Sequence, residues 1–398
     1  MKKLMLLGGA QYLLPVIKEA HALGLYVITC DYLPDNIAHK YADEYCNVSI
    51  IDKDAVLEAA QRLEINGIMS FACDPGVVTA AYVAEKMGLS FAGSYEAVSI
   101  LQNKGRFRAF LRDNGFNVPW AKSYTDANEA LRDAESFSWP MIVKPTDSAG
   151  SKGVRRVDSI EELSDAIAFA LEFSHGGEFI VEQFIQQQGS SSDSDSFSVD
   201  GRLCFCSFDE QLFDPEAENP YTPAAYVWPS SMPDDIQAEL RSELQRLMSL
   251  LGLKTSVYNI ETRMGTDGKP YIMELSPRGG GNRLSEVLEM ATGTKLISNA
   301  VRAAVGMETD EMGDPEYKGH WAELILHSDR DGKFKELWIA PELESSVAQI
   351  DLWVQPGDSV ERFSGANKAI GTLVMNFAQR ELLEKCMKTH DWYKVIVE

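Results

Sequence analysis

Hydrophobic and polar positions near the start of the chain follow two alternating patterns. Short apolar runs predict buried strands at residues 3–7, 26–30 and 67–71. Between and after them, apolar residues recur every three to four positions, which predicts helices at residues 12–23, 54–63 and 77–87. Strands that alternate with helices indicate a parallel sheet, because a parallel connection needs a crossover. We therefore expect residues 1–93 to form a small doubly wound N-terminal domain.

From residue 94 onward the two patterns mix. Helical periodicity predicts helices over 94–114, 160–173, 235–251, 284–293 and 295–305. Strand-like runs occur at 141–144, 179–185 and 197–208, the last folded around an Asp-Gly turn. Two segments lack a period: the serine-rich stretch 186–196, which we expect to be a mobile loop, and 209–233, which we expect to be an extended excursion.

The last part of the chain has short strand-like runs between glycine and proline turns, and a final helix at 379–389. The expected fold class is therefore a multidomain α/β and α+β architecture. Its expected domains are a parallel-sheet N-terminal domain (1–93), a central domain with a small lid at about 120–185 (94–305) and a β-rich C-terminal subdomain (306–398).

A second Asp-Gly pair organises the stretch with the most distinctive chemistry. Asp267-Gly268 lies between two alternating runs and predicts a hairpin with a two-residue loop. In that register Glu261 faces Glu274, and Asn259 faces Ser276. Opposed carboxylates repel each other, and a divalent cation held between oxygen ligands would offset the repulsion. The competing interpretation is a surface hairpin with solvated glutamates.

Two further features suit phosphate groups. Arg278 and three glycines at 279–281 follow the hairpin, which predicts a fixed cation and exposed backbone N–H groups beside the metal. Upstream, Lys144 ends a predicted strand and precedes a small, glycine-bearing loop at 147–153. Such a loop can place its amides over phosphates, although it is no P-loop, since GxxxxGK[ST] is absent. A plain hairpin loop is the alternative.

Composition narrows the classes of function. The 398 residues include 37 basic and 60 acidic ones, a net charge of −23, which argues against nucleic-acid and anionic-membrane binding. The six cysteines form no CxxC pair and the six histidines do not cluster, so neither a zinc site nor a disulfide framework is expected. No apolar run is long enough for a membrane span or a signal peptide, so a cytoplasmic enzyme is the default expectation.

The glycines at 8–9, with Asp31 downstream, invite a dinucleotide-binding interpretation. The sequence GGAQYL lacks the GxGxxG spacing, so this signal is weak. Because ligands collect at the carboxyl ends of parallel strands, a contact with substrate is a further interpretation. The Cys-Asp-Pro-Gly segment at 73–76 follows another predicted strand, and the same interpretation, a contact with substrate, applies to it.

In this order the features resemble the ATP-grasp superfamily, over residues 1 to about 305. The shared features are the strand lysine Lys144, the glycine-bearing loop, a strand with Glu182, and a glutamate pair followed by Arg278. The chain looks most similar to the branch of carbamoyl-phosphate-synthetase-like enzymes and amino-acid ligases, with biotin carboxylase and phosphoribosylglycinamide synthetase as cousins. The resemblance implies an ATP-grasp fold.

The resemblance also implies which residues bind the nucleotide. Lys104 and Lys144 look like the two lysines that hold its phosphates, and the loop 147–153 looks like the flexible flap over them. The flap residues implied as contacts are Ser148, Ser151 and Gly153. The linker implied to recognise adenine is Glu182, Gln183, Phe184 and Ile185, with Glu182 accepting from the amino group. Asp195 looks like the acid that binds the ribose hydroxyls.

The remaining roles concern metal and chemistry. Glu261 and Glu274 look like the carboxylates that bind magnesium at the β- and γ-phosphates, and Arg278 looks like the arginine that steadies an acyl phosphate. The family usually has asparagine where this chain has Ser276, whose hydroxyl is a shorter and poorer metal ligand. Arg278, Glu274 and Lys144 are the expected catalytic residues. ATP and Mg²⁺ are the expected cofactors, with Mn²⁺ as an alternative metal.

The resemblance implies an ATP-dependent ligase that joins a carboxylate to an amine through an acyl phosphate. The expected substrates are an amino acid or a small amino compound, a homodimer is compatible, and no nucleic acid or membrane is expected. Two alternatives stay open. One is an enzyme like phosphoribosylglycinamide synthetase or carbamoyl-phosphate synthetase, and the other is an ATP-binding regulatory protein without catalytic activity.

Overall fold

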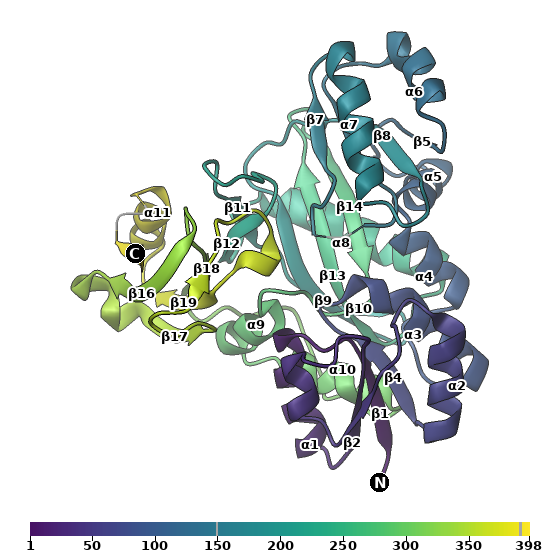
Figure 1. Ribbon diagram of the computed structural model, residues 1–398, viewed down its shortest axis with the longest axis vertical. Coiled ribbons are helices and arrows are strands. Elements are labelled where there is room, and N and C mark those ends of the chain that lie inside the picture. The colour runs from purple at the N-terminus through teal and green to yellow at the C-terminus, as the bar shows by residue number, and fades with distance from the viewer. Residues whose placement is uncertain (149, 390–391) are drawn as a thin grey trace. The chain divides into compact units, whose positions relative to one another are not determined.

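The structure is a computed structural model and describes residues 1–148, 150–389 and 392–398. These residues form two compact units, each assembled from segments far apart in the sequence (Figure 1). Unit 1 comprises Met1–Val118, Asp193–Ser207 and Pro233–Pro315, and unit 2 comprises Pro119–Ser192, Phe208–Met232 and Glu316–Glu398. The expected lid (about 120–185) and residues 316–398 of the expected C-terminal subdomain lie in unit 2, whereas residues 306–315 belong to unit 1.

Unit 1 begins with the parallel sheet that the sequence predicts. Its strands, in the order β3-β2-β1-β4, are β1 (Lys3–Leu7), β2 (Tyr26–Cys30), β3 (Glu44–Cys46) and β4 (Gly67–Ser70). The accompanying helices are α1 (Leu14–Ala22), α2 (Lys53–Leu63) and α3 (Asp74–Met87). Met5, Ile28 and Ile68 of the sheet share a core with Val56 of α2 and Ala80 of α3. Because both faces of such a sheet are buried, its strands are apolar at nearly every position.

Unit 1 also holds an antiparallel sheet of order β10-β9-β13-β14. Its strands are β9 (Ser192–Val199), β10 (Arg202–Cys206), β13 (Ser256–Met264) and β14 (Pro270–Ser276). The helices of this part are α4 (Tyr95–Gln102), α5 (Lys104–Asp113), α8 (Asp234–Leu251), α9 (Leu284–Thr292) and α10 (Leu296–Ala304). The helical pattern over 94–114 is two helices, because the Asn103 side chain caps α5 by accepting from the Arg106 N–H at 2.9 Å.

The serine-rich stretch that we expected to be a mobile loop forms most of strand β9 instead. Hydroxyl groups of this stretch are buried and hydrogen-bonded: Ser194 Oγ lies 2.8 Å from Ser207 Oγ, and Ser191 Oγ donates to Gln211 Oε1 at 3.0 Å. Small polar side chains are tolerated in a buried strand when each has a hydrogen-bond partner. Polar composition therefore did not indicate mobility here.

The β13–β14 hairpin pairs Glu261 with Glu274 as predicted, but through two irregularities that cancel. Met264 pairs with Pro270, so the connecting turn is longer than the two residues expected. Farther along, a β-bulge beyond Glu261 leaves Met273 as an extra residue on β14. The bulge restores the register that the longer turn had shifted.

Unit 2 contains an antiparallel sheet of order β5-β8-β6-β7. Its strands are β5 (Ala121–Tyr124), β6 (Met141–Pro145), β7 (Arg155–Val157) and β8 (Phe179–Gln183). Helices α6 (Ala127–Asp133) and α7 (Ile160–Glu172) cover it, and Leu163 and Ile167 of α7 share a core with Val143 and Val181 of the sheet. Met141 of β6 and Phe179 of β8 lie in the same core, so alternate residues of both strands share one apolar face.

The rest of unit 2 is β-rich, as expected for residues 306–398. One sheet has the order β11-β12-β15-β19-β17 and the other has the order β18-β16-β20. The elements are β11 (Glu210–Phe213), β12 (Pro223–Trp228), β15 (His320–Leu326), β16 (Gly332–Ile339), β17 (Val347–Leu352), β18 (Ser359–Val360), β19 (Gly371–Phe377), α11 (Arg380–Thr389) and β20 (Tyr393–Val397). The excursion expected over 209–233 thus supplies two strands of a sheet, since β12 pairs with β15.

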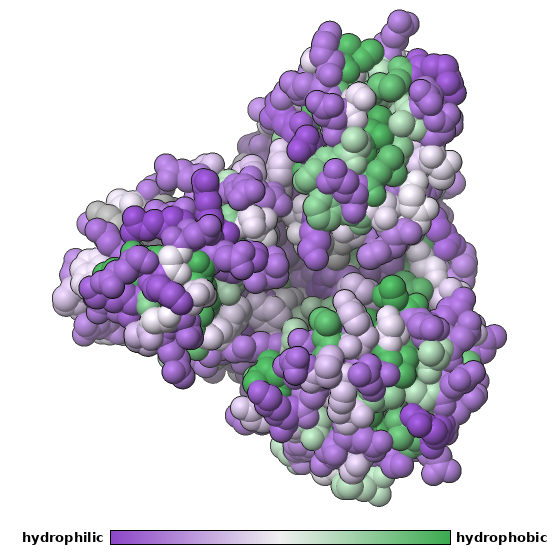
Figure 2. Space-filling model, in the orientation of Figure 1, coloured by the Kyte–Doolittle hydropathy of each residue, from purple (hydrophilic) through white to green (hydrophobic). Residues whose placement is uncertain are grey.

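The surface agrees with the acidic, polar composition of the chain. Figure 2 shows hydrophobic residues scattered among hydrophilic ones on the face in view. Among the described residues, no helix is both long enough and apolar enough to cross a bilayer. All six cysteines lie in the described part of the chain and are free thiols.

Candidate functional site

The two opposed glutamates of unit 1 lie on one face of the hairpin, because residues directly opposite in an antiparallel pair share a face. Each has a cationic partner. Arg263 Nη2 is 2.6 Å from Glu261 Oε1, and Lys104 Nζ is 3.1 Å from Glu274 Oε1. The Glu274 side chain remains 47% exposed and that of Glu261 22%. Protein cations therefore offset part of the repulsion that the sequence led us to assign to a metal alone.

Lys104 is positioned by the start of helix α5. The Asn103 cap fixes this end of the helix, and Lys104 is the first residue after it. Burial lowers the pKa of Lys104, but the carboxylates of Glu274 and Asp74 outweigh this effect, so that its pKa is raised. Lys104 is therefore a firmly charged ammonium group next to the hairpin, as a phosphate-binding lysine must be.

Arg278 is held by an acid from the parallel sheet. Asp74, the first residue of α3, accepts from Arg278 Nε at 2.9 Å and from Nη2 at 2.7 Å, a bidentate pair. Burial raises the pKa of Asp74, but the charge and hydrogen bonds of Arg278, together with the Ser276 hydrogen bond and the charge of Lys104, outweigh burial and lower it. Ser276 Oγ donates to the same carboxylate at 3.0 Å and accepts from Gln102 Nε2 at 2.8 Å.

The three glycines after Arg278 differ in what surrounds them. A Cβ on Gly279 would lie 2.2 Å from the Phe71 ring, and one on Gly280 would lie 2.9 Å from Asp195 Oδ1, whereas Gly281 faces open space. The Gly280 N–H donates to Asp195 at 2.8 Å. This corrects the expectation that all three glycines expose their backbone N–H groups. Two of them serve close packing inside unit 1.

Asp195, which the resemblance led us to expect as a ribose-binding acid, lies buried inside unit 1. Its side chain has no solvent exposure, and its oxygens accept from the Gly280 N–H, Asn259 Nδ2 and Ser285 Oγ. Burial raises the pKa of Asp195 to about 6, against the opposing effect of the Ser285 and Gly280 hydrogen bonds. The position fits an internal structural anchor instead.

The hairpin fits a magnesium site in its donor chemistry. Mg²⁺ in nucleotide sites usually binds one or two carboxylates, and phosphate and water oxygens complete its shell. Glu261 and Glu274 supply two carboxylates on one face, and Ser276 is two residues beyond Glu274 on that face. Over residues 1–148, 150–389 and 392–398, no group of three or more His, Cys, Asp or Glu is arranged to hold a metal. The pair would therefore need oxygens from a ligand.

The two candidate residues of the unit 2 sheet also lie together. Lys144 Nζ on β6 is 2.6 Å from Glu182 Oε1 on the neighbouring strand β8. Both residues are buried. Glu182 was expected to accept from adenine, and in this structure it accepts from the lysine that was expected to bind phosphate.

Two backbone N–H groups of the linker at the end of β8 are hydrogen-bonded within the protein. The Gln183 N–H donates to the Trp120 carbonyl at 2.8 Å, and the Phe184 N–H donates to the Pro140 carbonyl at 3.1 Å. Gln183 is exposed, whereas Phe184 and Ile185 are half-buried. These two N–H groups already donate within unit 2, so recognition of adenine by this segment, as we expected, would use its other groups.

The expected flap is anchored at both ends. Asp147 accepts from Ser174 Oγ at 3.0 Å and from the Gly176 N–H at 2.7 Å. Ser151 has a positive φ of 58°, and its Oγ donates to the Tyr221 carbonyl at 2.9 Å. Ser148 is half-buried and Gly153 is buried. Ala149, inside the expected flap, lies outside the described residues.

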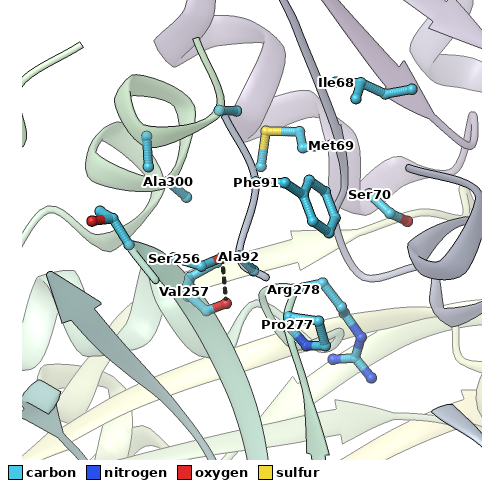
Figure 3. Close-up of a pocket in the computed structure, with 13 residues that line it drawn as sticks. Ile68, Met69, Ser70, Phe91, Ala92, Ser256, Val257, Pro277, Arg278 and Ala300 are labelled. Carbon is cyan, nitrogen blue, oxygen red and sulfur yellow. Dashed lines mark hydrogen bonds between the residues drawn. The ribbon is translucent and has the colours of Figure 1, made fainter. Parts of the chain in front are cut away.

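A pocket in unit 1 lies beside Arg278. It is lined mainly by apolar groups from β4, residues 91–92, the start of β13 and α10. Figure 3 shows Met69 and Phe91 on one side and the Arg278 guanidinium directed away from them. The charged end of Arg278 therefore faces Asp74 rather than this pocket.

Two residues of this network were not assigned a role from the sequence. Asp74 was noted only as part of a loop at a strand end, and Gln102 was not singled out. Asp74 is 204 positions from Arg278, so no local spacing connects them. The available signal was its place directly after a buried strand, at the edge where ligands of parallel sheets collect.

Comparisons with known proteins point in one direction. The ATP-grasp domain family model matches residues 137–286. The chain is 24% identical over 315 residues to the carbamoyl phosphate synthase large chain of a Thermoanaerobacter species, covering 75% of this chain but only 28% of that relative. The chain therefore spans little more than a quarter of that protein.

Solved structures show the same fold. The L-amino acid ligase from Bacillus licheniformis matches with a TM-score of 0.82 at 20% identity, over 100% of this chain and 99% of that one. The phosphoribosylglycinamide synthetase from Anaerococcus prevotii matches with a TM-score of 0.76 at 20% identity, over 100% of both chains.

Proposed function

The chain belongs to the ATP-grasp superfamily, and we propose from this premise that it is a carboxylate–amine ligase that cleaves ATP to ADP. The substrates we propose are a small carboxylate and an amine, of which at least one is an amino acid or a small amino compound. The full-length fold match to an L-amino acid ligase supports this choice.

The observation that carries the proposal is the face of the β13–β14 hairpin. Glu261 and Glu274 lie opposite each other there, and Lys104 contacts Glu274. Arg278 follows on the same chain segment and is oriented by Asp74. Two carboxylates, a lysine and an oriented arginine are the groups that phosphoryl transfer needs, since that reaction depends on positioning and charge neutralisation.

The chemistry follows from the reactivity of a carboxylate. A carboxylate is a poor electrophile, and transfer of the γ-phosphoryl group to one of its oxygens gives an acyl phosphate. Attack by the amine on the acyl carbon then expels phosphate. A bound Mg²⁺ would neutralise phosphate charge at Glu261 and Glu274. Lys104 and Lys144 are the proposed phosphate contacts in unit 1 and unit 2, and Arg278 the proposed contact for the acyl phosphate.

The adenine and flap assignments are part of the same proposal. We assign adenine recognition to the linker 183–185 and phosphate contacts to Ser148, Ser151 and Gly153, on the strength of the resemblance. The buried ion pair of Lys144 and Glu182 supports a fixed lysine in this unit, because the 2.6 Å contact holds its ammonium group in place.

A screen for ADP release tests the proposal. The purified protein is incubated with ATP, Mg²⁺ and pooled L-amino acids, and the ADP formed is compared with that from each carboxylate alone, each amine alone and no acceptor. Glu274→Gln, prepared in parallel, controls for contaminating ATPases. ADP release that needs both substrates supports a ligase, and AMP with pyrophosphate as products would contradict it.

Further arms of the screen separate the alternatives. Release that needs bicarbonate would indicate a carbamate-forming enzyme, and release that needs a phosphorylated sugar amine would indicate a phosphoribosylglycinamide-synthetase-like enzyme. Tight ATP binding without turnover in any arm would indicate a nucleotide-binding regulatory protein.

A further inference from the structure

Asp195 joins three separate segments of unit 1 from inside the molecule. It lies in the middle of β9, and its side chain has no solvent exposure. Its Oδ1 accepts from the Gly280 N–H at 2.8 Å and from Asn259 Nδ2 of β13 at 3.3 Å, and its Oδ2 accepts from Ser285 Oγ of α9. One carboxylate therefore connects the loop that contains Gly280, the β13–β14 hairpin and helix α9 after the loop.

Burying a carboxylate is costly unless hydrogen bonds or opposite charge stabilise it. The charge of Arg278 contributes to stabilising the carboxylate, although burial still raises the pKa of Asp195. The direct ion pair of Arg278 is nevertheless made with Asp74. Asp195 therefore acts on Arg278 through the backbone that follows it and through its charge, without a direct contact.

The loop that Asp195 holds is strained. Asn282 and Arg283 have positive φ angles of 52° and 62°, a conformation that is unfavourable for residues other than glycine. Asn282 accepts from the Tyr12 hydroxyl at 3.0 Å, and Arg283 pairs with Glu286 at 3.1 Å. Such strain persists only where the surroundings hold it in place, and it is concentrated at functional sites.

Gly280 shows how closely the loop is fitted to Asp195. A Cβ at this position would lie 2.6 Å from Leu284 Cδ1, and 2.9 Å from both Asn259 Nδ2 and Asp195 Oδ1. Glycine is therefore required by the close approach of the carboxylate. The carboxylate and the glycine together fix the path of the backbone that leads from Arg278 into α9.

We propose that Asp195 is a positioning residue: it fixes the 279–283 loop, and thereby the orientation of Arg278, without touching nucleotide or substrate. The inference rests on the proposed function for what Arg278 does, and on the hydrogen bonds alone for what Asp195 holds. It replaces the expectation that Asp195 binds ribose, and the two roles predict different kinetics.

The test compares Asp195→Asn with Asp200→Asn, the same change at an exposed position in the turn that follows β9. Asp195→Asn should lower kcat roughly 10- to 100-fold, the usual range for residues that orient a reacting group. KM for ATP and the Kd of a nonhydrolysable ATP analogue should stay within about twofold, because a positioning role spares ground-state binding. Asp200→Asn should match wild type. A weakened nucleotide Kd with unchanged kcat would indicate a ribose contact, and unchanged kcat and Kd would remove Asp195 from the mechanism.

A second variant covers the case in which Asp195→Asn does not fold. Ser285→Ala removes only the donor to Oδ2, and it should lower kcat in the same direction by a smaller factor, with KM for ATP unchanged. Wild-type kcat in Ser285→Ala would contradict the proposal.

A third measurement separates failure of this proposal from failure of the proposed function. Backbone hydrogen exchange over residues 279–283 reports on the loop without any turnover. Asp195→Asn, or Ser285→Ala in its place, should speed exchange there, and Asp200→Asn should not. If wild type shows no ligase activity but this pattern appears, the proposed function is wrong and the positioning role of Asp195 is supported. If exchange is unchanged, the positioning role of Asp195 is contradicted, whatever the activity.

Discussion

The carboxylates of the unit 1 hairpin and the ion pair of the unit 2 sheet differ in burial. On the unit 1 hairpin, the Glu274 and Glu261 side chains are 47% and 22% exposed, although both contact cations. In unit 2, the Lys144 and Glu182 side chains are 10% and 3% exposed and pair directly with each other. An exposed carboxylate can exchange a protein cation for a metal at little cost, whereas a buried pair cannot lose one partner without leaving a buried charge.

This difference indicates that the hairpin and the β6–β8 pair have different roles. The hairpin is suited to react to a ligand, because solvent and ions reach its carboxylates. The β6–β8 pair is suited to keep one ammonium group fixed in place. If so, substitutions of the hairpin carboxylates should affect activity far more than stability, and substitutions of the β6–β8 pair should affect both.

The largest effect is expected from Glu274→Gln. The change keeps the shape of the side chain but removes a charge proposed to bind magnesium, so that turnover should fall on the order of 10³-fold. The thermal midpoint should stay close to that of wild type, because the site is exposed. Glu243→Gln, at a glutamate on α8 that pairs with Arg246, is the matched control and should change neither property. Turnover near wild type in Glu274→Gln would show that the pair is no metal site.

Lys144→Met should affect both properties. It leaves the Glu182 carboxylate buried without this cation, which should cost roughly 3 kcal/mol of unfolding free energy. Turnover should also fall, because a proposed phosphate contact is lost. Urea unfolding and ADP release measure the two effects.

The double variant Lys144→Met/Glu182→Gln sharpens the comparison. It removes both charges, so it should recover much of the stability but none of the activity. Full recovery of activity would contradict the role of Lys144, and no recovery of stability would show that the pair is not what stabilises this sheet.

Asp74→Asn should lower turnover less than Glu274→Gln or Lys144→Met. An amide can still accept one hydrogen bond from Arg278 but loses the charged bidentate contact, so turnover should drop roughly tenfold. Asp54→Asn is the control and should behave as wild type; Asp54 lies on α2, is exposed, and accepts a hydrogen bond from the Tyr82 hydroxyl of α3. If Asp74→Asn retains full turnover, the orientation of Arg278 does not limit the reaction.

The smallest effect is expected from Arg263→Gln. The change removes the cation 2.6 Å from Glu261, so that the negative charge of the carboxylate is less compensated. The Mg²⁺ concentration for half-maximal turnover should therefore decrease by about two- to fivefold, on the order of 0.4–1 kcal/mol, as for a partly exposed ion pair. A higher requirement for Mg²⁺ would mean that Arg263 itself contributes to the ligand site.

The sequence predicted the parts of this structure whose signal is local. The first strands and helices, α8 and the Asp200-Gly201 turn follow from periodicity and turn chemistry. The pairing of Glu261 with Glu274 was also correct, although the predicted turn was too short, because the bulge at Met273 compensated for it. That agreement depended on two features that the sequence does not show.

The remainder depends on contacts between distant segments. The serine-rich part of β9 looked mobile because its composition is polar, but hydrogen bonds such as Ser194 to Ser207 make it a buried strand. Asp74 and Arg278 meet only because the fold brings α3 to the end of β14. The burial of Asp195 follows from the packing of α9 and the glycine loop, which no spacing in the sequence reveals.

The most direct test of the central claim follows the oxygen atoms of the carboxylate. Once the screen has identified a substrate pair, the carboxylate is labelled with ¹⁸O in both oxygens, and the phosphate released is analysed by mass spectrometry. Reaction through an acyl phosphate predicts that one labelled oxygen appears in inorganic phosphate for each product formed. Label in AMP, or phosphate without label, would contradict the mechanism proposed for this chain.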